Sequence, residues 1–170
     1  MESGRSRMKI PFFKSTFTGD EPEVFRQLFE VPDSFAKKEF TAKCEKWFAE
    51  NHGLKNFFLT KSCTDSLELA ALVLGIKEDD EVILPSYSFV PCGNAFVLRG
   101  AKCVFVDIHP DTMNIDEKKV ARAITSKTKA ILTLNYASIS CNYEELRRIA
   151  QKYGLFIVDF LNFIPKLCIF

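Results

Sequence analysis

The stretch KSCTDSLELAALVLGIKEDDEVILP, residues 61–85, decides the fold class. Its first half has the apolar spacing of a helix, with Ser62 and Asp65 placed as a variant of the capping box and Gly75 placed as a helix stop. The residues on the expected buried face are Leu67, Ala70, Ala71 and Leu74. A short apolar strand, Glu81–Pro85, follows immediately. A helix that leads directly into such a strand is typical of a βαβ unit, so the stretch predicts an α/β protein with a mostly parallel sheet.

The same alternation of strand and helix patterns continues on both sides of this stretch. The expected strands are Phe57–Thr60, Glu81–Pro85, Lys102–Ile108, Lys129–Asn135 and Leu155–Phe160. The expected helices lie between them, over 62–74, over 94–99, after the cap residue Asp116, and from the cap residue Asn142 to Gly154. Val104, Phe105 and Val106 are expected to be buried on both faces, as in most parallel strands. Right-handed crossovers between these strands predict one α/β layer with flanking helices, whose ligands bind at the carboxyl ends of the strands.

The sequence divides into three regions. Residues 1–53 form an N-terminal arm, in which Ile10–Phe13 is expected to be extended and a helix ends near Gly53. The apolar residues of that helix are Phe40, Cys44, Trp47 and Phe48. Residues 54–160 form the α/β core, and residues 161–170 form an apolar tail that favours aggregation unless it is covered.

Composition excludes several classes of protein. With 47% apolar and 26% charged residues, a chain of 170 residues can bury a core, which excludes disorder. Lys+Arg 23 against Asp+Glu 22 leaves a formal charge of +1, which argues against nucleic acid as a partner. The apolar stretch Leu155–Phe170 is shorter than the roughly 20 residues of a membrane-spanning helix, so no membrane span is expected. No apolar run follows the basic residues near the N-terminus, so a cytoplasmic location is expected.

The cysteines do not suggest a metal site. The six cysteines are Cys44, Cys63, Cys92, Cys103, Cys141 and Cys168, and the two histidines are His52 and His109. None of these residues has zinc-type spacing, so no metal is expected. Buried thiols are the preferred interpretation over disulfides.

Three segments that follow expected strands carry side chains suited to chemistry. Lys61–Ser66 joins a strand to a helix N-terminus and suits a phosphate, although an ordinary helix cap is the preferred interpretation. Tyr87 and Phe89 could stack on a planar ligand, although composition favours core packing. Asp159 ends the last strand, where its carboxylate either pairs with a cationic ring nitrogen or is a solvated strand-end acid.

Five stretches together resemble the sugar-nucleotide aminotransferases of the DegT/DnrJ/EryC1/StrS group. These stretches are 59–68, 80–90, 94–101, 104–108 and 111–116, and the resemblance extends from Lys9 to about Val158. It implies the large domain, in truncated form, of the aspartate-aminotransferase (fold type I) kind of pyridoxal 5'-phosphate (PLP) enzyme. It also implies dimers with sites at the subunit interface. The expected reaction is amino transfer from glutamate to a dTDP-4-keto-6-deoxy nucleotide sugar for polysaccharide biosynthesis.

The resemblance also implies roles for individual residues. Thr64 and the backbone of Asp65 would hold the cofactor phosphate, and Phe89 would stack on the pyridine ring. Other positions depart from the family pattern. Asp65 stands where a small residue is common, and Asn135–Ser138 replaces His-Tyr-Ala-Gly.

The end of the last strand departs furthest from the family. Phe160 stands where the family has the aspartate that pairs with the pyridine nitrogen, and Asp159 should point to the opposite face because strand side chains alternate. No lysine of this sequence can be assigned the Schiff-base role, so no catalytic residue is predicted. The tail Leu161–Phe170 resembles nothing in the family, as a truncation or a reading-frame change would produce.

We therefore expect the isolated chain to be inactive and to self-associate. Two alternatives stay open. One is a non-catalytic remnant or binding module, and the other is one half of a split enzyme whose lysine comes from a second polypeptide.

Overall fold

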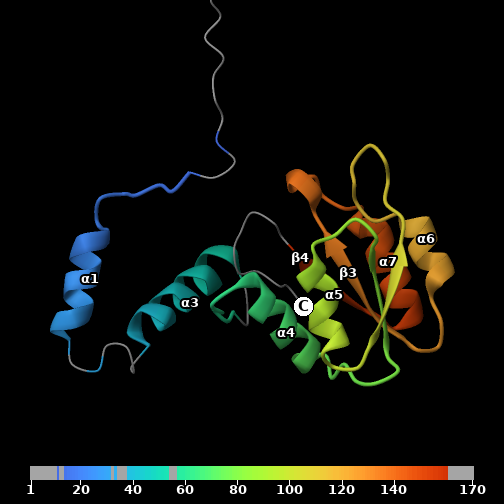
Figure 1. The fold of residues 1–170 in the computed structure, drawn as a ribbon, viewed down its shortest axis with the longest axis horizontal. Coiled ribbons are helices and arrows are strands. Elements are labelled where there is room, and N and C mark those ends of the chain that lie inside the picture. The colour runs from blue at the N-terminus through green and yellow to red at the C-terminus, as the bar shows by residue number, and fades with distance from the viewer. Residues whose placement is uncertain (1–10, 12–13, 32, 34–37, 54–56, 161–170) are drawn as a thin grey trace, which may run out of the picture. The chain divides into compact units, whose positions relative to one another are not determined.

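The computed structural model describes residues 11, 14–31, 33, 38–53 and 57–160 (Figure 1). The expected extended segment 10–13, apart from Pro11, and the tail 161–170 lie outside the described residues. The chain divides into two compact units, residues 1–57 and 58–170, and each is described by itself.

The first unit contains the helices α1 (Glu21–Glu30) and α3 (Glu39–His52). Helix α3 is the one expected from the sequence, and it ends at Gly53 in the left-handed conformation (φ 63°) that commonly terminates a helix. Helix α1 is missing from the prediction, although Val24, Phe25 and Leu28 have the spacing of one helix face. At its start, the Glu21 side chain accepts a hydrogen bond from the Thr18 N–H at 2.8 Å. Neither helix contains a buried residue.

The second unit is built on a parallel sheet of four described strands. These are β1 (Glu81–Pro85), β2 (Lys102–Val106), β3 (Thr128–Leu134) and β4 (Phe156–Phe160). Their order is β2-β1-β3-β4, and all three pairings are parallel. The carboxyl ends of the strands therefore share one edge, which we call the carboxyl edge, and the sequence predicts ligand binding there.

Helices cover both faces of this sheet (Figure 1). Helices α4 (Cys63–Val73) and α5 (Val90–Val97) pack on one face, in a cluster that contains the buried residues Leu67, Phe96 and Leu132. Helices α6 (Glu117–Ala123) and α7 (Tyr143–Tyr153) pack on the other, in a cluster that contains Ile131 and Leu146. We call these the α4/α5 face and the α6/α7 face. The result is the predicted α/β arrangement of a parallel sheet with flanking helices.

Helix ends in this unit follow the signals in the sequence. The side chains of Ser62, Asp116 and Asn142 each accept a hydrogen bond from a backbone N–H in the first turn of α4, α6 and α7. These bonds satisfy donors that have no partner inside a helix. Gly75 and Gly154 adopt the left-handed conformation just after α4 and α7, as expected for helix stops.

Three predictions about individual elements are wrong. Residues 57–60 form no strand, because none of the four strands of the sheet pairs with them. Phe105 is 60% exposed rather than buried, because β2 has only β1 as a neighbour among the described strands and lies at an edge. Helix α5 begins at Val90 rather than Asn94, since Pro91 suits the first turn of a helix.

Candidate functional site

The N-terminus of α4 combines a side-chain cap with several hydroxyl groups. Ser62 Oγ accepts a hydrogen bond from the Asp65 N–H at 3.1 Å, and Thr60 Oγ1 donates to the Ser62 carbonyl at 2.8 Å. Thr64 and Asp65 are half-buried in the first turn. The preferred interpretation, a helix cap, is therefore confirmed. A phosphate here would find the positive end of the helix, but the Asp65 N–H already has a partner and the Asp65 carboxylate would repel the anion.

The loop between β1 and α5 presents two aromatic rings at the carboxyl edge. Ser86 N–H continues the sheet by donating to the Val106 carbonyl at 2.8 Å, and the chain then turns away from the sheet. Phe89 is the N-cap residue of α5 and is 67% exposed, while Tyr87 is 47% exposed. Composition favours core packing for both residues, and that prediction is wrong. The exposed ring of Phe89 is available to stack on a planar ligand.

Tyr87 is paired with Tyr136, which lies in the loop after β3. Its hydroxyl oxygen lies 3.2 Å from that of Tyr136, and the two rings meet edge to face with centroids 5.2 Å apart. Tyr136 also packs against the cluster on the α4/α5 face. The hydrogen bond to Tyr87 raises the pKa of Tyr136, which favours the neutral form of the Tyr136 phenol. In the sequence, Tyr87 follows one expected strand and Tyr136 follows another, but nothing local connects the two residues, so their pairing is not predicted.

The last two residues of β4 face opposite sides of the sheet, as strand alternation predicts. Asp159 Oδ1 accepts hydrogen bonds from Thr133 Oγ1 and Asn135 Nδ2, each at 3.1 Å. Burial and the hydrogen bond to Asp159 raise the pKa of Tyr143, a half-buried residue of α7. Phe160 is buried in the cluster on the α4/α5 face. The carboxylate therefore lies toward α7, away from the face that carries Tyr136.

Among the described residues of the second unit, the thiols do not form a nucleophilic site. Burial raises the pKa of Cys92 and of Cys141 to about 11 in each case, and it raises the pKa of Cys63 and of Cys103 as well. A raised pKa keeps a thiol protonated and unreactive. Buried thiols are thus confirmed for Cys92 and Cys141. Cys44, in the first unit, is exposed, and the five cysteines that the structure describes are all free.

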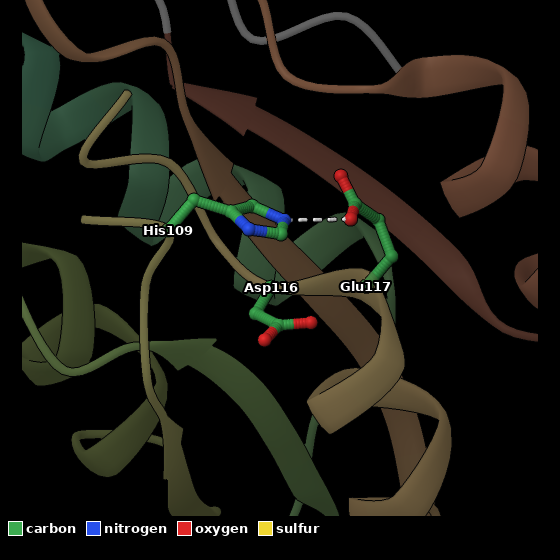
Figure 2. Close-up of side chains that lie close together, drawn as sticks. All are labelled: His109, Asp116 and Glu117. Carbon is green, nitrogen blue, oxygen red and sulfur yellow. Dashed lines mark hydrogen bonds and ion pairs between the residues drawn. The ribbon is translucent and has the colours of Figure 1, made fainter. Parts of the chain in front are cut away.

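A polar cluster between β2 and α6 places potential metal ligands together (Figure 2). His109, Asp116 and Glu117 each have a ligand atom within 4.8 Å of the others. His109 Nε2 is bonded to Glu117 Oε2 at 2.9 Å, and Asp116 Oδ1 caps α6 by accepting from Lys118 and Lys119. These atoms already satisfy one another and the helix end, whose positive dipole disfavours a cation. Asp116 therefore caps α6, and the His109–Glu117 pair lies beside that cap.

A family model and two relatives of known name are similar to this chain. A family model described as the DegT/DnrJ/EryC1/StrS aminotransferase family matches residues 21–159. The chain is 31% identical over 150 residues to GDP-perosamine synthase of Escherichia coli O157:H7, a match that covers 88% of this chain and 41% of that protein. It is 37% identical over 115 residues to the spore coat polysaccharide biosynthesis protein SpsC of Bacillus subtilis (strain 168), covering 68% of this chain and 30% of that protein.

A solved structure extends the likeness to the fold. NtdA from Bacillus subtilis, with its bound cofactor PMP, matches with a TM-score of 0.78 and 28% identity, over 93% of this chain and 38% of that chain. The match confirms the predicted fold class. PMP is the aminated form of PLP, so the predicted family cofactor is confirmed as well. The chain spans less than half of the length of each of these relatives.

Proposed function

The chain belongs to the DegT/DnrJ/EryC1/StrS aminotransferase family, and from this premise we propose that it is the cofactor-binding part of a PLP-dependent sugar-nucleotide aminotransferase. The amino donor is glutamate, and the acceptor is a nucleotide-linked 4-keto-6-deoxy sugar, with dTDP as the proposed nucleotide. The observation that carries this proposal is the exposed Phe89 ring at the N-terminus of α5, on the same face of the sheet as Thr64 at the N-terminus of α4.

The residues of the α4/α5 face fit the phosphate and one ring face of PLP. The first turn of α4 offers backbone N–H groups and the Thr64 hydroxyl to a phosphate. Phe89 offers an exposed aromatic face to the pyridine ring. When bound, PLP supplies an electron sink for amino transfer. In this proposal Thr64 and Phe89 anchor and orient the cofactor, and Asp65 weakens the hold on its phosphate by charge repulsion.

The end of β4 offers no carboxylate to the ring nitrogen of PLP on the α4/α5 face. A carboxylate near this nitrogen would keep it protonated, but the buried side chain of Phe160 occupies that face at the end of β4. Asp159 is engaged by Thr133 and Asn135 on the other face. None of the lysines in the sequence is assigned to the aldehyde of the cofactor. We therefore propose that the isolated chain binds PLP without completing amino transfer.

A second candidate function is a non-catalytic binding module, and the buried position of Phe160 favours it. A third is one half of a split enzyme. The two differ in what a second polypeptide of the family would do. Adding that polypeptide should restore glutamate-dependent conversion of PLP to PMP in a split enzyme and should have no effect on a binding module.

A PLP titration of the purified chain, followed by absorbance and circular dichroism, tests the proposal. Thr64→Val should weaken binding about tenfold, because it removes one hydrogen bond to a charged group. Phe89→Ala should weaken it about fivefold, because it removes ring stacking. The matched controls are Thr125→Val, near the amino ends of the strands, and Phe105→Ala, which removes a similarly exposed ring. Both controls should leave the affinity unchanged.

Each outcome of this titration decides one part of the proposal. Failure of the unmodified chain to bind PLP saturably would overturn it. Binding that all four variants leave intact would place the cofactor elsewhere in the chain. A stoichiometric lysine adduct after borohydride reduction would contradict the proposed inactivity of the isolated chain, because it would show that one of its lysines reacts with the aldehyde.

Self-association and cellular location are proposed on the same premise, membership of the family. The chain self-associates, as a family dimer or through the edge strand β2, and it acts in the cytoplasm. Among the described helices, none has the length and apolar character needed to cross a membrane.

A further inference from the structure

We propose that Asn114 is a positioning residue that holds Tyr136 against Tyr87, so that the two phenols form an uncharged, hydrogen-bonding wall of the site on the α4/α5 face. This inference rests on the proposed function where it concerns the ligand. The placement of the tyrosines by Asn114 is independent of that function and is tested separately below.

Asn114 connects two loops that are distant in the sequence. Its side chain is buried, with 3% of the residue exposed. Its Oδ1 accepts a hydrogen bond from the Tyr136 N–H at 3.0 Å, and its Nδ2 donates to the Ile139 carbonyl at 2.9 Å. One amide thus holds both ends of the short turn at residues 136–139.

The turn that Asn114 holds has an unfavourable backbone conformation. Ala137 (φ 49°) and Ser138 (φ 65°) are both left-handed, although neither is glycine. A Cβ atom disfavours this region, so two such residues in succession persist only where surrounding contacts fix them. The two hydrogen bonds of Asn114 supply such contacts from outside the turn. Without them, the turn should relax and Tyr136 should leave its place.

The position of Tyr136 matters because of what lies beside it. Its hydroxyl is 3.2 Å from that of Tyr87, which is only two residues before Phe89. The mutual bond uses one of the two phenolic hydrogens and leaves the other to donate. The pair can therefore donate to a ligand oxygen, such as a sugar hydroxyl or a phosphate oxygen, without placing a charge in the site.

Titration of the tyrosine rings by NMR tests the placement directly. In the unmodified chain, Tyr136 should titrate above the ordinary tyrosine pKa because of its bond to Tyr87. Asn114→Ala should bring this pKa back toward the ordinary value, and Tyr87→Phe, which removes the partner, should do the same. Asn142→Ala is the matched control, since it removes another asparagine side chain that bonds to the backbone, at the start of α7. It should leave the titration of Tyr136 unchanged.

PLP affinity is the second measurement. Asn114→Ala and Tyr87→Phe should each weaken binding about fivefold, as expected for the loss of one hydrogen bond. An Asn114→Ala chain that is less stable but keeps both the Tyr136 pKa and the affinity would overturn the inference, because Asn114 would then be only structural. If no form of the chain binds PLP, the proposed function fails while the titration still decides the role of Asn114.

A second variant covers the case in which Asn114→Ala does not fold. Asn114→Asp keeps an acceptor for the Tyr136 N–H and removes the donor to the Ile139 carbonyl. Because its new carboxylate would itself raise the pKa of Tyr136, this variant is read by the NMR cross-peaks between the rings of Tyr87 and Tyr136, which should weaken. A folded Asn114→Asp chain with unchanged cross-peaks between the two rings would overturn the inference.

Discussion

Asp159 and Phe160 show how one step along a strand changes the chemistry of a site. The two residues are adjacent in β4, yet the carboxylate is bonded to Thr133 and Asn135 while the aromatic ring is buried on the α4/α5 face. Two donors compensate the partial burial of the charge. Because side chains alternate strictly along a strand, this carboxylate can reach the other face only if the register of β4 shifts by one residue.

The ion pair between His109 and Glu117 should make stability depend on pH. The hydrogen bond to Glu117 raises the pKa of His109 above its usual 6.5 in the folded chain. The folded state therefore holds this proton more tightly than the unfolded state does, and the pair stabilises below the unfolded pKa. That stabilisation is lost as the pH rises through the folded pKa.

Chemical unfolding at about pH 6 and about pH 8 measures this effect. The unmodified chain should lose more unfolding free energy across this window than His109→Asn or Glu117→Gln does. Glu144→Gln, which removes an exposed acid from α7, should behave like the unmodified chain. Equal losses in all four proteins would show that the pair does not contribute.

For individual residues, the sequence predicts features that depend on neighbouring residues in the chain. It does not predict features that depend on contacts between residues distant in the sequence. The opposite directions of Asp159 and Phe160 follow from strand alternation alone. The exposure of Phe89 does not, because composition cannot show that the chain leaves the sheet before α5. The link from Asn114 to Tyr136 is also unpredictable, since it depends on how two loops meet after folding.

Among the helices and strands, the signals at helix ends are the most reliable. The caps at Ser62, Asp116 and Asn142 depend on residues within one turn, so the sequence contains all the information needed. Helix α1 had such a signal as well, in the bond from the Thr18 N–H to Glu21. Residues 57–60 have the composition of a strand, but a strand also needs a neighbour, and none of the described strands pairs with them.

The edge strand β2 should promote self-association. It has one described neighbour, and Phe105 on it is 60% exposed. Phe105→Lys should reduce association in light scattering, because a charge on an edge strand opposes pairing with another chain. Its unfolding free energy should change by no more than about 0.5 kcal/mol, as for most surface substitutions.

A matched substitution distinguishes pairing through the edge strand from non-specific association through exposed apolar side chains. Leu98 follows α5, is 72% exposed and belongs to none of the described strands. Leu98→Lys should leave the association unchanged if β2 drives it. Equal association in the unmodified chain and in Phe105→Lys would show that β2 is not the contact.

Across the whole molecule, stability should come from the second unit. Every buried residue that the structure describes lies between Ser66 and Phe160. A chain of residues 58–170 should therefore unfold cooperatively, with a midpoint within roughly 4 °C of the full chain, which is about 1 kcal/mol for a domain of this size. Residues 1–57 alone should show no cooperative transition by circular dichroism. Loss of cooperative unfolding in residues 58–170 would show that the first unit contributes to the core.

The strand order β2-β1-β3-β4 also has a consequence for the newly synthesised chain. Strand β1 is made first but lies inside the sheet, so the sheet grows from its centre outward. After β2 has left the ribosome, the other side of β1 stays open until β3 and the intervening α6 have followed. An open apolar strand edge in a nascent chain invites aggregation. Molecular chaperones should therefore matter most after residue 106 has left the ribosome and before residue 134 has left it.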